Sequence, residues 1–194
     1  YGIYLKRGAS ENLVGGPLPA DRNVVSGNIR LGVVLDSLTH NNRILGNYIG
    51  TDKNGSAPLG NGRGSSQGAA ILIHQSYSNS IGDVTPGSGN IICASVGNGI
   101  TIREAMSTAN KVQGNKIGIN ADGHALGNSK NGIYLTYAWG GPNPGFPNTS
   151  TIGGTDASAG NVIANNGEAG VRMDGGTGNA VLSNSICANM GLGI

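Results

Sequence analysis

The sequence contains few aromatic and few charged residues. Its 194 residues include one Phe, one Trp and six Tyr, and only 11% are charged, with a formal net charge of +2 at pH 7. Eight aromatic rings are too few to fill a thick core. We therefore expect a narrow aliphatic core. Nucleic-acid-binding proteins usually carry a basic patch or stripe. The sequence contains no such cluster, so we expect no nucleic-acid partner.

Cysteines and long apolar runs are also scarce. Two cysteines are too few for a disulfide scaffold. No apolar run approaches the roughly 20 residues that a membrane-spanning helix needs, so we expect no membrane span. The first residue is Tyr1 and no signal peptide follows it. This start is compatible with a removed leader or with a fragment of a longer protein.

Glycine and asparagine, in contrast, are abundant, with 36 and 24 residues respectively. The glycines follow no Gly-X-Y period, which excludes collagen, and the recurring Val and Ile argue against disorder. Short apolar segments led by a small residue repeat along the chain, at residues 2–5, 32–35, 70–73, 99–102, 132–135 and 170–173. Two further strands follow each of them, and most begin with Asn two residues before an aliphatic residue. The repeat predicts about six coils of three short strands.

Stacking of these coils explains the composition. Strands lie about 4.8 Å apart in a sheet, so equivalent residues of successive coils lie over one another. The inward column is then Ile3, Val33, Ile71, Ile100, Ile133 and Val171. Stacked asparagines can satisfy one another and the turn backbone, and we expect Asn110 to be buried in such a stack. A further column precedes the first strands and comprises Asn28, Ser95, Asn128, Asn166 and Asn189.

A β-sandwich or barrel of short hairpins is the alternative all-β fold. Three asparagine columns in register do not follow from hairpins, whereas stacked coils require them. The prediction is therefore an all-β parallel β-helix, or β-solenoid.

Three phrases resemble a known family: residues 46–52, 152–155 and 160–166, which read GNYIGTD, IGGT and GNVIANN. They resemble right-handed parallel β-helix repeat proteins of the pectin-lyase-like superfamily, especially its large bacterial surface and secreted members. The resemblance covers essentially the whole chain. It implies that residues 1–194 form a single β-helix segment of a longer protein, extracellular or at the cell surface. It does not imply one function, because the superfamily includes lyases, hydrolases, epimerases, phage spikes and adhesins.

Enzymes of this family commonly carry their chemistry on the outer face of one parallel sheet. On the first strands, Asp36, His74 and Arg103 share one outward column, with neighbours roughly 5 Å apart. A lyase or epimerase needs a base for the sugar C5 proton and a cation for the carboxylate, and this trio offers both. The simpler interpretation is a solvated face whose mixed charges prevent sheets from associating.

Other site chemistries find less support. The ten acidic residues are scattered along the chain, so we expect no metal site and no cofactor. Glycoside hydrolysis needs two facing carboxylates, and Asp36 and Asp174 share a column but lie four coils apart.

The loop from Tyr137 to Asn148 is the candidate contact surface, because it holds Trp139 and Phe146 and lies near Tyr134. Aromatic rings stack on sugars and anchor partners, although these rings could also simply cover an apolar patch. We therefore interpret the chain as a non-catalytic structural or binding segment. It would contact a polysaccharide or surface glycan, or associate with itself through its terminal coils. The alternative is a polysaccharide-active enzyme: a lyase, epimerase or hydrolase.

Overall fold

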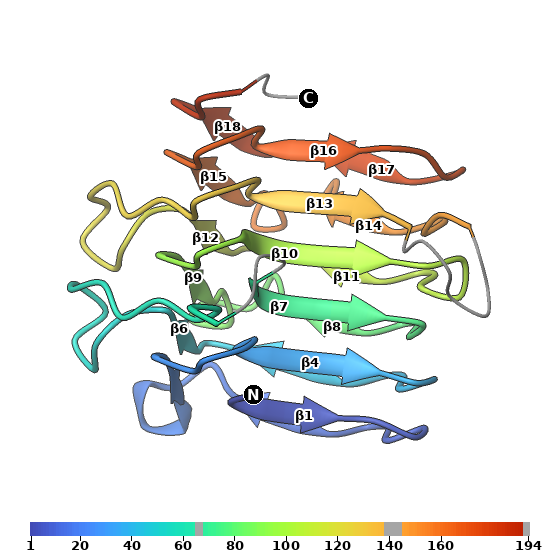
Figure 1. The fold of residues 1–194 in the computed structure, drawn as a ribbon, viewed down its shortest axis with the longest axis horizontal. Helices are drawn as coiled ribbons and strands as arrows, with labels where there is room; N and C mark the ends of the chain where they lie inside the picture. The colour runs from blue at the N-terminus through green and yellow to red at the C-terminus, as the bar shows by residue number, and fades with distance from the viewer. Residues whose placement is uncertain (65–67, 138–144, 192–194) are drawn as a thin grey trace.

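A computed structural model describes residues 1–64, 68–137 and 145–191. These residues form a right-handed parallel β-helix, as predicted, in which three strands make one coil and six coils stack along the axis (Figure 1). The one helix among the described residues is the 3-10 turn η1 (Pro19–Asp21). None of the helical structure in these residues is long and apolar enough to cross a membrane.

Each of the three sheets takes one strand from every coil, and all its strand pairs are parallel. The first sheet contains β1 (Ile3–Leu5), β4 (Val33–Asp36), β7 (Ala69–His74), β10 (Asn98–Arg103), β13 (Ile133–Thr136) and β16 (Val171–Met173). The second contains β2 (Leu13–Gly15), β5 (Arg43–Leu45), β8 (Ser80–Ile81), β11 (Lys111–Val112), β14 (Thr151–Gly153) and β17 (Ala180–Leu182). The third contains β3 (Val24–Val25), β6 (Tyr48–Ile49), β9 (Ile91–Ile92), β12 (Lys116–Ile117), β15 (Val162–Ala164) and β18 (Ser185–Cys187).

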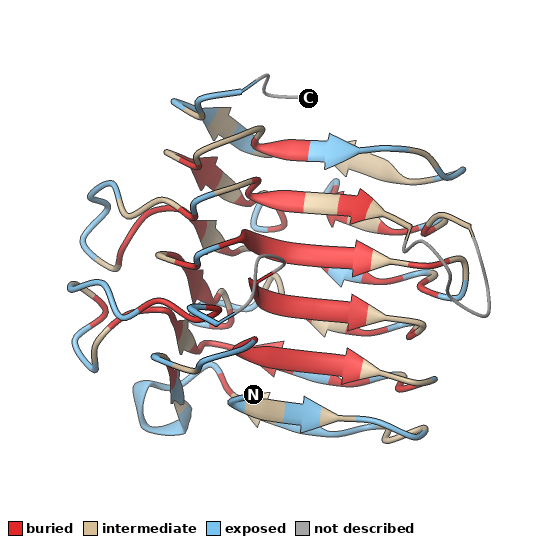
Figure 2. Cartoon of the chain, viewed as in Figure 1, coloured by how far each residue is buried: buried red, intermediate tan, exposed pale blue. Residues whose placement is uncertain are grey.

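The strand register places the predicted inward column in one line. Ile3 pairs with Val33, and the line continues through the next four coils to Val171. Val33 and the Ile residues of the next three coils are fully buried, and Val171 is 1% exposed. Ile3 is partly exposed because it lies in the terminal coil, where the burial colours of Figure 2 are paler. The core is thus a narrow aliphatic column, as the scarcity of aromatic residues indicated.

Asparagine ladders satisfy the polar groups at the corners between sheets. Asn110 is fully buried, as predicted: its Oδ1 accepts hydrogen bonds from the backbone and side-chain nitrogens of Asn79 at 3.0 and 3.2 Å. Its Nδ2 donates to the carbonyl of Ser76 at 2.9 Å. In the column before the first strands, Asn61 accepts from Asn28 at 2.8 Å. Sequence reasoning missed Asn61, because the insertion that follows it displaces it from the position four residues before β7.

One ladder is interrupted at Ser150, which occupies an asparagine position in the fifth coil. Its hydroxyl is buried and has no hydrogen-bond partner among the described residues. In Ser150→Asn, the new Oδ1 should accept from Asn110 as Asn110 accepts from Asn79. We expect this variant to raise the free energy of unfolding by about 1 kcal/mol, measured by urea denaturation. Ser150→Ala is the control, since it removes the unpaired hydroxyl without completing the ladder. A gain no larger in Ser150→Asn than in Ser150→Ala would contradict the expectation.

The outer face of the first sheet is not uniformly solvated, in contrast to the simpler interpretation of its outward columns. Val34 and Leu72 point outward, yet they are only 3% and 8% exposed. They form a second small apolar cluster with Leu31, which lies two residues before β4, and with Ala69, the first residue of β7. At the same corner the fourth and fifth coils have Asn98 and Asn131, and on the face of the sixth coil Arg172 is exposed. The outer face is therefore apolar in the second and third coils and polar in the fourth to sixth.

Candidate functional site

A polar cleft of about 590 Å³ lies on this outer face, over the fourth to sixth coils. Parallel register aligns its lining residues in three lines that run along the helix axis. The corner line contains Asn98 and Asn131, with Glu168 next to the residue that follows in register; the floor contains Thr101, Tyr134 and Arg172, and the line beyond the floor contains Arg103, Thr136 and Asp174. Lys130 and Tyr137 complete the lining. Alternation of side chains along each strand turns the floor and the line beyond it outward, away from the aliphatic core.

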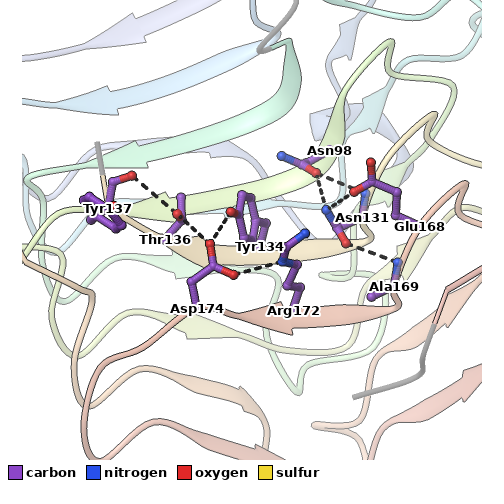
Figure 3. A network of polar contacts seen from close by, with 9 residues as sticks. All are labelled: Asn98, Asn131, Tyr134, Thr136, Tyr137, Glu168, Ala169, Arg172 and Asp174. Carbon is purple, nitrogen blue, oxygen red and sulfur yellow. Dashed lines mark hydrogen bonds and ion pairs between the residues drawn. The ribbon is translucent and has the colours of Figure 1, made fainter. Parts of the chain in front are cut away.

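Asp174 is the centre of one wall of the cleft (Figure 3). One of its oxygens accepts hydrogen bonds from the hydroxyls of Tyr134 and of Thr136, the latter at 3.2 Å, and the other accepts from Arg172 Nε at 2.9 Å. The guanidinium of Arg172 also lies over the ring of Tyr134, 5.1 Å from its centroid. All three donors hold the carboxylate in one orientation, so the cluster is preorganised.

These contacts set the charge states in this wall. Burial acts to raise the pKa of Asp174, but hydrogen bonds from Tyr134 and Arg172 outweigh it and hold that pKa below its ordinary value. Burial, followed by the hydrogen bond to Asp174, raises the pKa of Tyr134. Near neutral pH the carboxylate is thus ionised and the phenol protonated. Neither group is poised to exchange a proton with a ligand.

The second wall lies along the corner line. It consists of side-chain amides and ends at a carboxylate. Asn98 donates to the hydroxyl of Thr101 at 3.1 Å and accepts from Asn131 at 3.1 Å. The Asn131 amide also donates to Glu168 Oε2 at 2.6 Å, and its oxygen accepts from the backbone of Ala169 at 3.1 Å. Asn131 therefore has its amide group fully engaged and serves to orient Glu168 toward the cleft (Figure 3).

The predicted trio Asp36, His74 and Arg103 is only partly brought together. His74 Nδ1 lies 2.8 Å from Asp36 Oδ1, and Tyr4 donates to the other oxygen of Asp36 at 2.7 Å. Burial acts to raise the pKa of Asp36, yet the hydrogen bonds from Tyr4 and His74 outweigh it and lower that pKa. The bond to Asp36 in turn raises the pKa of Tyr4 to about 12. Arg103 pairs with His74 in the strand register and lines the cleft.

The other ring nitrogen of His74 faces the interior. His74 Nε2 lies 3.9 Å from Glu104 Oε1, and the Glu104 side chain is fully buried. His74 itself is 22% exposed. The ring is thus held between two carboxylates. Among the described residues, no group of three or more His, Cys, Asp or Glu side chains has a geometry that could hold a metal ion.

The predicted aromatic surface divides into two parts. Tyr134 and Tyr137 line the cleft. Phe146 does not line it; its ring meets Tyr137 edge-on at 5.0 Å and packs closely beside Gly175. Trp139 lies outside the described residues. The cleft is therefore bounded by tyrosines from β13 and from the residue that follows it.

Sequence reasoning did not select Asn98, Lys130, Asn131 or Glu168 as site residues. They lie at the corner where the first strands begin, away from the outward columns of the strands. One signal was available: Asn98 and Asn131 stand in the fourth and fifth coils where the second and third have Leu31 and Ala69. A change from apolar to polar residues at one position of a repeat indicates a change in what covers that face.

Neither a protein-family model nor a curated protein sequence matches the chain. Among solved structures, the chain is similar to the periplasmic alginate epimerase AlgG, with a TM-score of 0.63 and 18% sequence identity, covering 94% of this chain and 36% of that chain. A single-mutant form of that enzyme gives a TM-score of 0.65 at 18% identity, covering 95% of this chain and 36% of that one. The chain thus spans about a third of the length of these proteins. At such low identity the likeness supports the right-handed parallel β-helix fold alone.

Proposed function

We propose that this chain is a polysaccharide-binding segment of an extracellular or cell-surface protein, and that the ligand lies in the cleft over the fourth to sixth coils. The observation that carries the proposal is the pair of ordered polar walls on either side of a tyrosine-bearing floor. Sugar hydroxyls both donate and accept hydrogen bonds, and prearranged polar groups bind them without first having to order their own side chains. Tyrosine rings offer an apolar face for a sugar ring beside a polar hydroxyl.

The charges of the cleft favour an anionic polysaccharide. Its lining contains three cationic side chains, those of Arg103, Lys130 and Arg172, and two carboxylates, those of Glu168 and Asp174. Both carboxylates are already engaged by protein donors. Arg172 uses Nε for Asp174, while its side chain remains 53% exposed, so the outer edge of the guanidinium is presented to a ligand. A guanidinium matches a carboxylate in a bidentate geometry, which points to a uronate polymer. The alginate epimerase with the same fold acts on a polymer of this kind.

Binding to alginate and to polygalacturonate, with neutral dextran as a comparison, tests the proposal by isothermal titration calorimetry. We expect the two uronate polymers to bind and Arg172→Gln to weaken them by about fivefold, since an exposed charged contact contributes up to about 1 kcal/mol. Lys53→Gln is the matched control, because it removes one positive charge from the loop after β6. The proposal would be rejected if neither uronate polymer bound, or if Arg172→Gln and Lys53→Gln weakened binding equally.

A polysaccharide lyase or epimerase is the second candidate, and the Asp36–His74 pair is the observation that favours it. Asp36 orients the imidazole, as a general base requires, and Arg103 is its neighbour in the register. Binding is preferred over catalysis because His74 Nε2 faces the buried Glu104. Incubation with both uronate polymers distinguishes the two. A lyase forms an unsaturated product that absorbs in the ultraviolet, and an epimerase changes the C5 configuration seen by NMR; either activity should disappear in His74→Gln.

A further inference from the structure

Two clusters with the same kinds of contact lie on the outer face of the first sheet. The first, here the N-terminal station, consists of Tyr4, Lys6 and Asp36. The second, the C-terminal station, consists of Tyr134, Arg172 and Asp174. In each, a tyrosine hydroxyl donates to an aspartate, and a cation lies over the tyrosine ring, 5.1 Å from its centroid in both cases.

The register shows that the tyrosine and the aspartate occupy equivalent positions of the repeat in the two stations, whereas the cation comes from the tyrosine's own coil in the first and from the next coil in the second. Tyr4 pairs with Val34, so Asp36 lies two residues beyond that partner in the next coil. Tyr134 pairs with Arg172, and Asp174 likewise lies two residues beyond. The stations are four coils apart, which is about 19 Å along the axis at the usual strand spacing.

A continuous line of polar side chains joins the stations. It runs across adjacent strands along the outward column that begins at Asp36, in the order Asp36, His74, Arg103, Thr136 and Asp174. Every member of this line is at least partly exposed. The neighbouring outward column, which forms the floor of the cleft in the later coils, is inaccessible in the second and third coils. There Val34 and Leu72 are buried in the outer apolar cluster. A ligand that leaves the cleft toward the N-terminal coils therefore meets the polar line.

The two carboxylates on this line are already bound by protein donors, whereas cations are exposed or partly exposed along it. Asp36 has one oxygen bound by Tyr4 and the other by His74 Nδ1. Asp174 has its oxygens bound by Tyr134, Thr136 and Arg172. Both carboxylates are thus turned to protein donors. Lys6 and Arg172 are exposed and Arg103 is partly exposed, so cations are presented near both ends of the line and between them. Such an arrangement is complementary to a polyanion.

We infer that a single anionic polysaccharide chain runs along the β-helix axis and contacts both stations, so that the binding site extends from the first coil to the sixth. This inference rests on the proposed function and adds to it the direction of the ligand and a second contact region outside the cleft. A disaccharide is too short to reach from one station to the other, whereas a long oligosaccharide reaches both. The two stations should therefore respond differently to ligand length.

The test compares Lys6→Gln and Arg172→Gln, with Lys53→Gln as the control, against a uronate disaccharide and a long oligosaccharide from the same polymer. Calorimetry at low salt gives each Kd, because exposed charge contacts are screened at high ionic strength. We expect Arg172→Gln to weaken both ligands by about threefold to fivefold. Lys6→Gln should weaken the long oligosaccharide by a similar factor and leave the disaccharide unchanged.

Three other results would overturn the inference. If Lys6→Gln leaves the long oligosaccharide unaffected while Arg172→Gln weakens it, the ligand is confined to the cleft, and the proposed function stands without the extended site. If Lys6→Gln weakens the disaccharide as well, the stations are two separate sites. If the unaltered protein binds neither ligand, the proposed function fails and the extended site fails with it.

Discussion

Replacing Asn115 with leucine should lower the free energy of unfolding by about 4 kcal/mol, measured by chemical denaturation. Asn115 is 1% exposed, and its Oδ1 accepts from the backbone and side-chain nitrogens of Asn90 at 3.0 and 2.9 Å. Its Nδ2 donates to Ile81 at 2.8 Å and to Asn161 at 2.9 Å. Leucine has a similar size but can make none of these bonds. The buried backbone N–H of Asn90 would lose its acceptor, and its side-chain amide would keep only the bond to the Ile44 carbonyl. An unsatisfied buried group costs about 1–3 kcal/mol in addition to each lost bond.

Asn23→Leu is the matched control, because Asn23 occupies the same column in the first coil. Its side chain is exposed and donates to Asn47 Oδ1 at 2.9 Å. The backbone of Asn23 also donates to that oxygen, at 3.2 Å, and this bond survives the substitution. We expect a loss of about 1 kcal/mol or less. Similar losses in both variants would show that the ladder does not owe its stability to buried polar groups.

Gly82→Ala should also destabilise the protein by about 4 kcal/mol. Gly82 follows β8 with a φ of +75°, and an added Cβ would lie 2.0 Å from the carbonyl oxygen of Gln113 and 2.6 Å from Asn115 Oδ1. The left-handed conformation costs a residue with a Cβ about 1–2 kcal/mol. Relieving the overlap requires two hydrogen-bonded coils to separate, which adds about 1–3 kcal/mol. Thermal and urea unfolding should both report the loss.

Gly123→Ala separates the two contributions. Gly123 has a similar φ of +86°, but no described atom lies within 4 Å of the position that its Cβ would take. The variant should therefore show only the conformational cost of about 1–2 kcal/mol. If Gly82→Ala is no more destabilising than Gly123→Ala, close stacking of the coils is not what requires glycine at this corner.

The sequence was sufficient to predict the coils, their register and the ladders. Stacked coils repeat their environment every turn, so a position that needs Ile or Asn needs it in each coil, and the pattern is visible as columns. Ile100 and Asn110 were identified in this way, and both are fully buried. Where a repeat is broken, the prediction failed locally. Asn61 lies next to an insertion, and its ladder position could not be read from spacing alone.

The candidate site was less accessible to sequence reasoning. Period-2 alternation predicted which side chains point outward, including Asp36 and His74, but not whether solvent reaches every part of that face. Val34 and Leu72 point outward and are nevertheless buried, because Leu31 and Ala69 pack beside them at the corner. Burial on an outer face depends on what folds over it, and that depends on contacts between residues far apart in the chain.

The sequence by itself determined that this protein is a stack of parallel coils with an aliphatic core and asparagine ladders, because each of those features repeats at every turn. Only the tertiary structure decided that the outer face is apolar over the early coils and forms a cleft over the later ones. It also joined Tyr134 to Asp174, which are 40 residues apart, and Tyr4 to Asp36, 32 residues apart. Such contacts depend on side chains from neighbouring coils meeting at one point, which a repeat pattern within the chain does not specify.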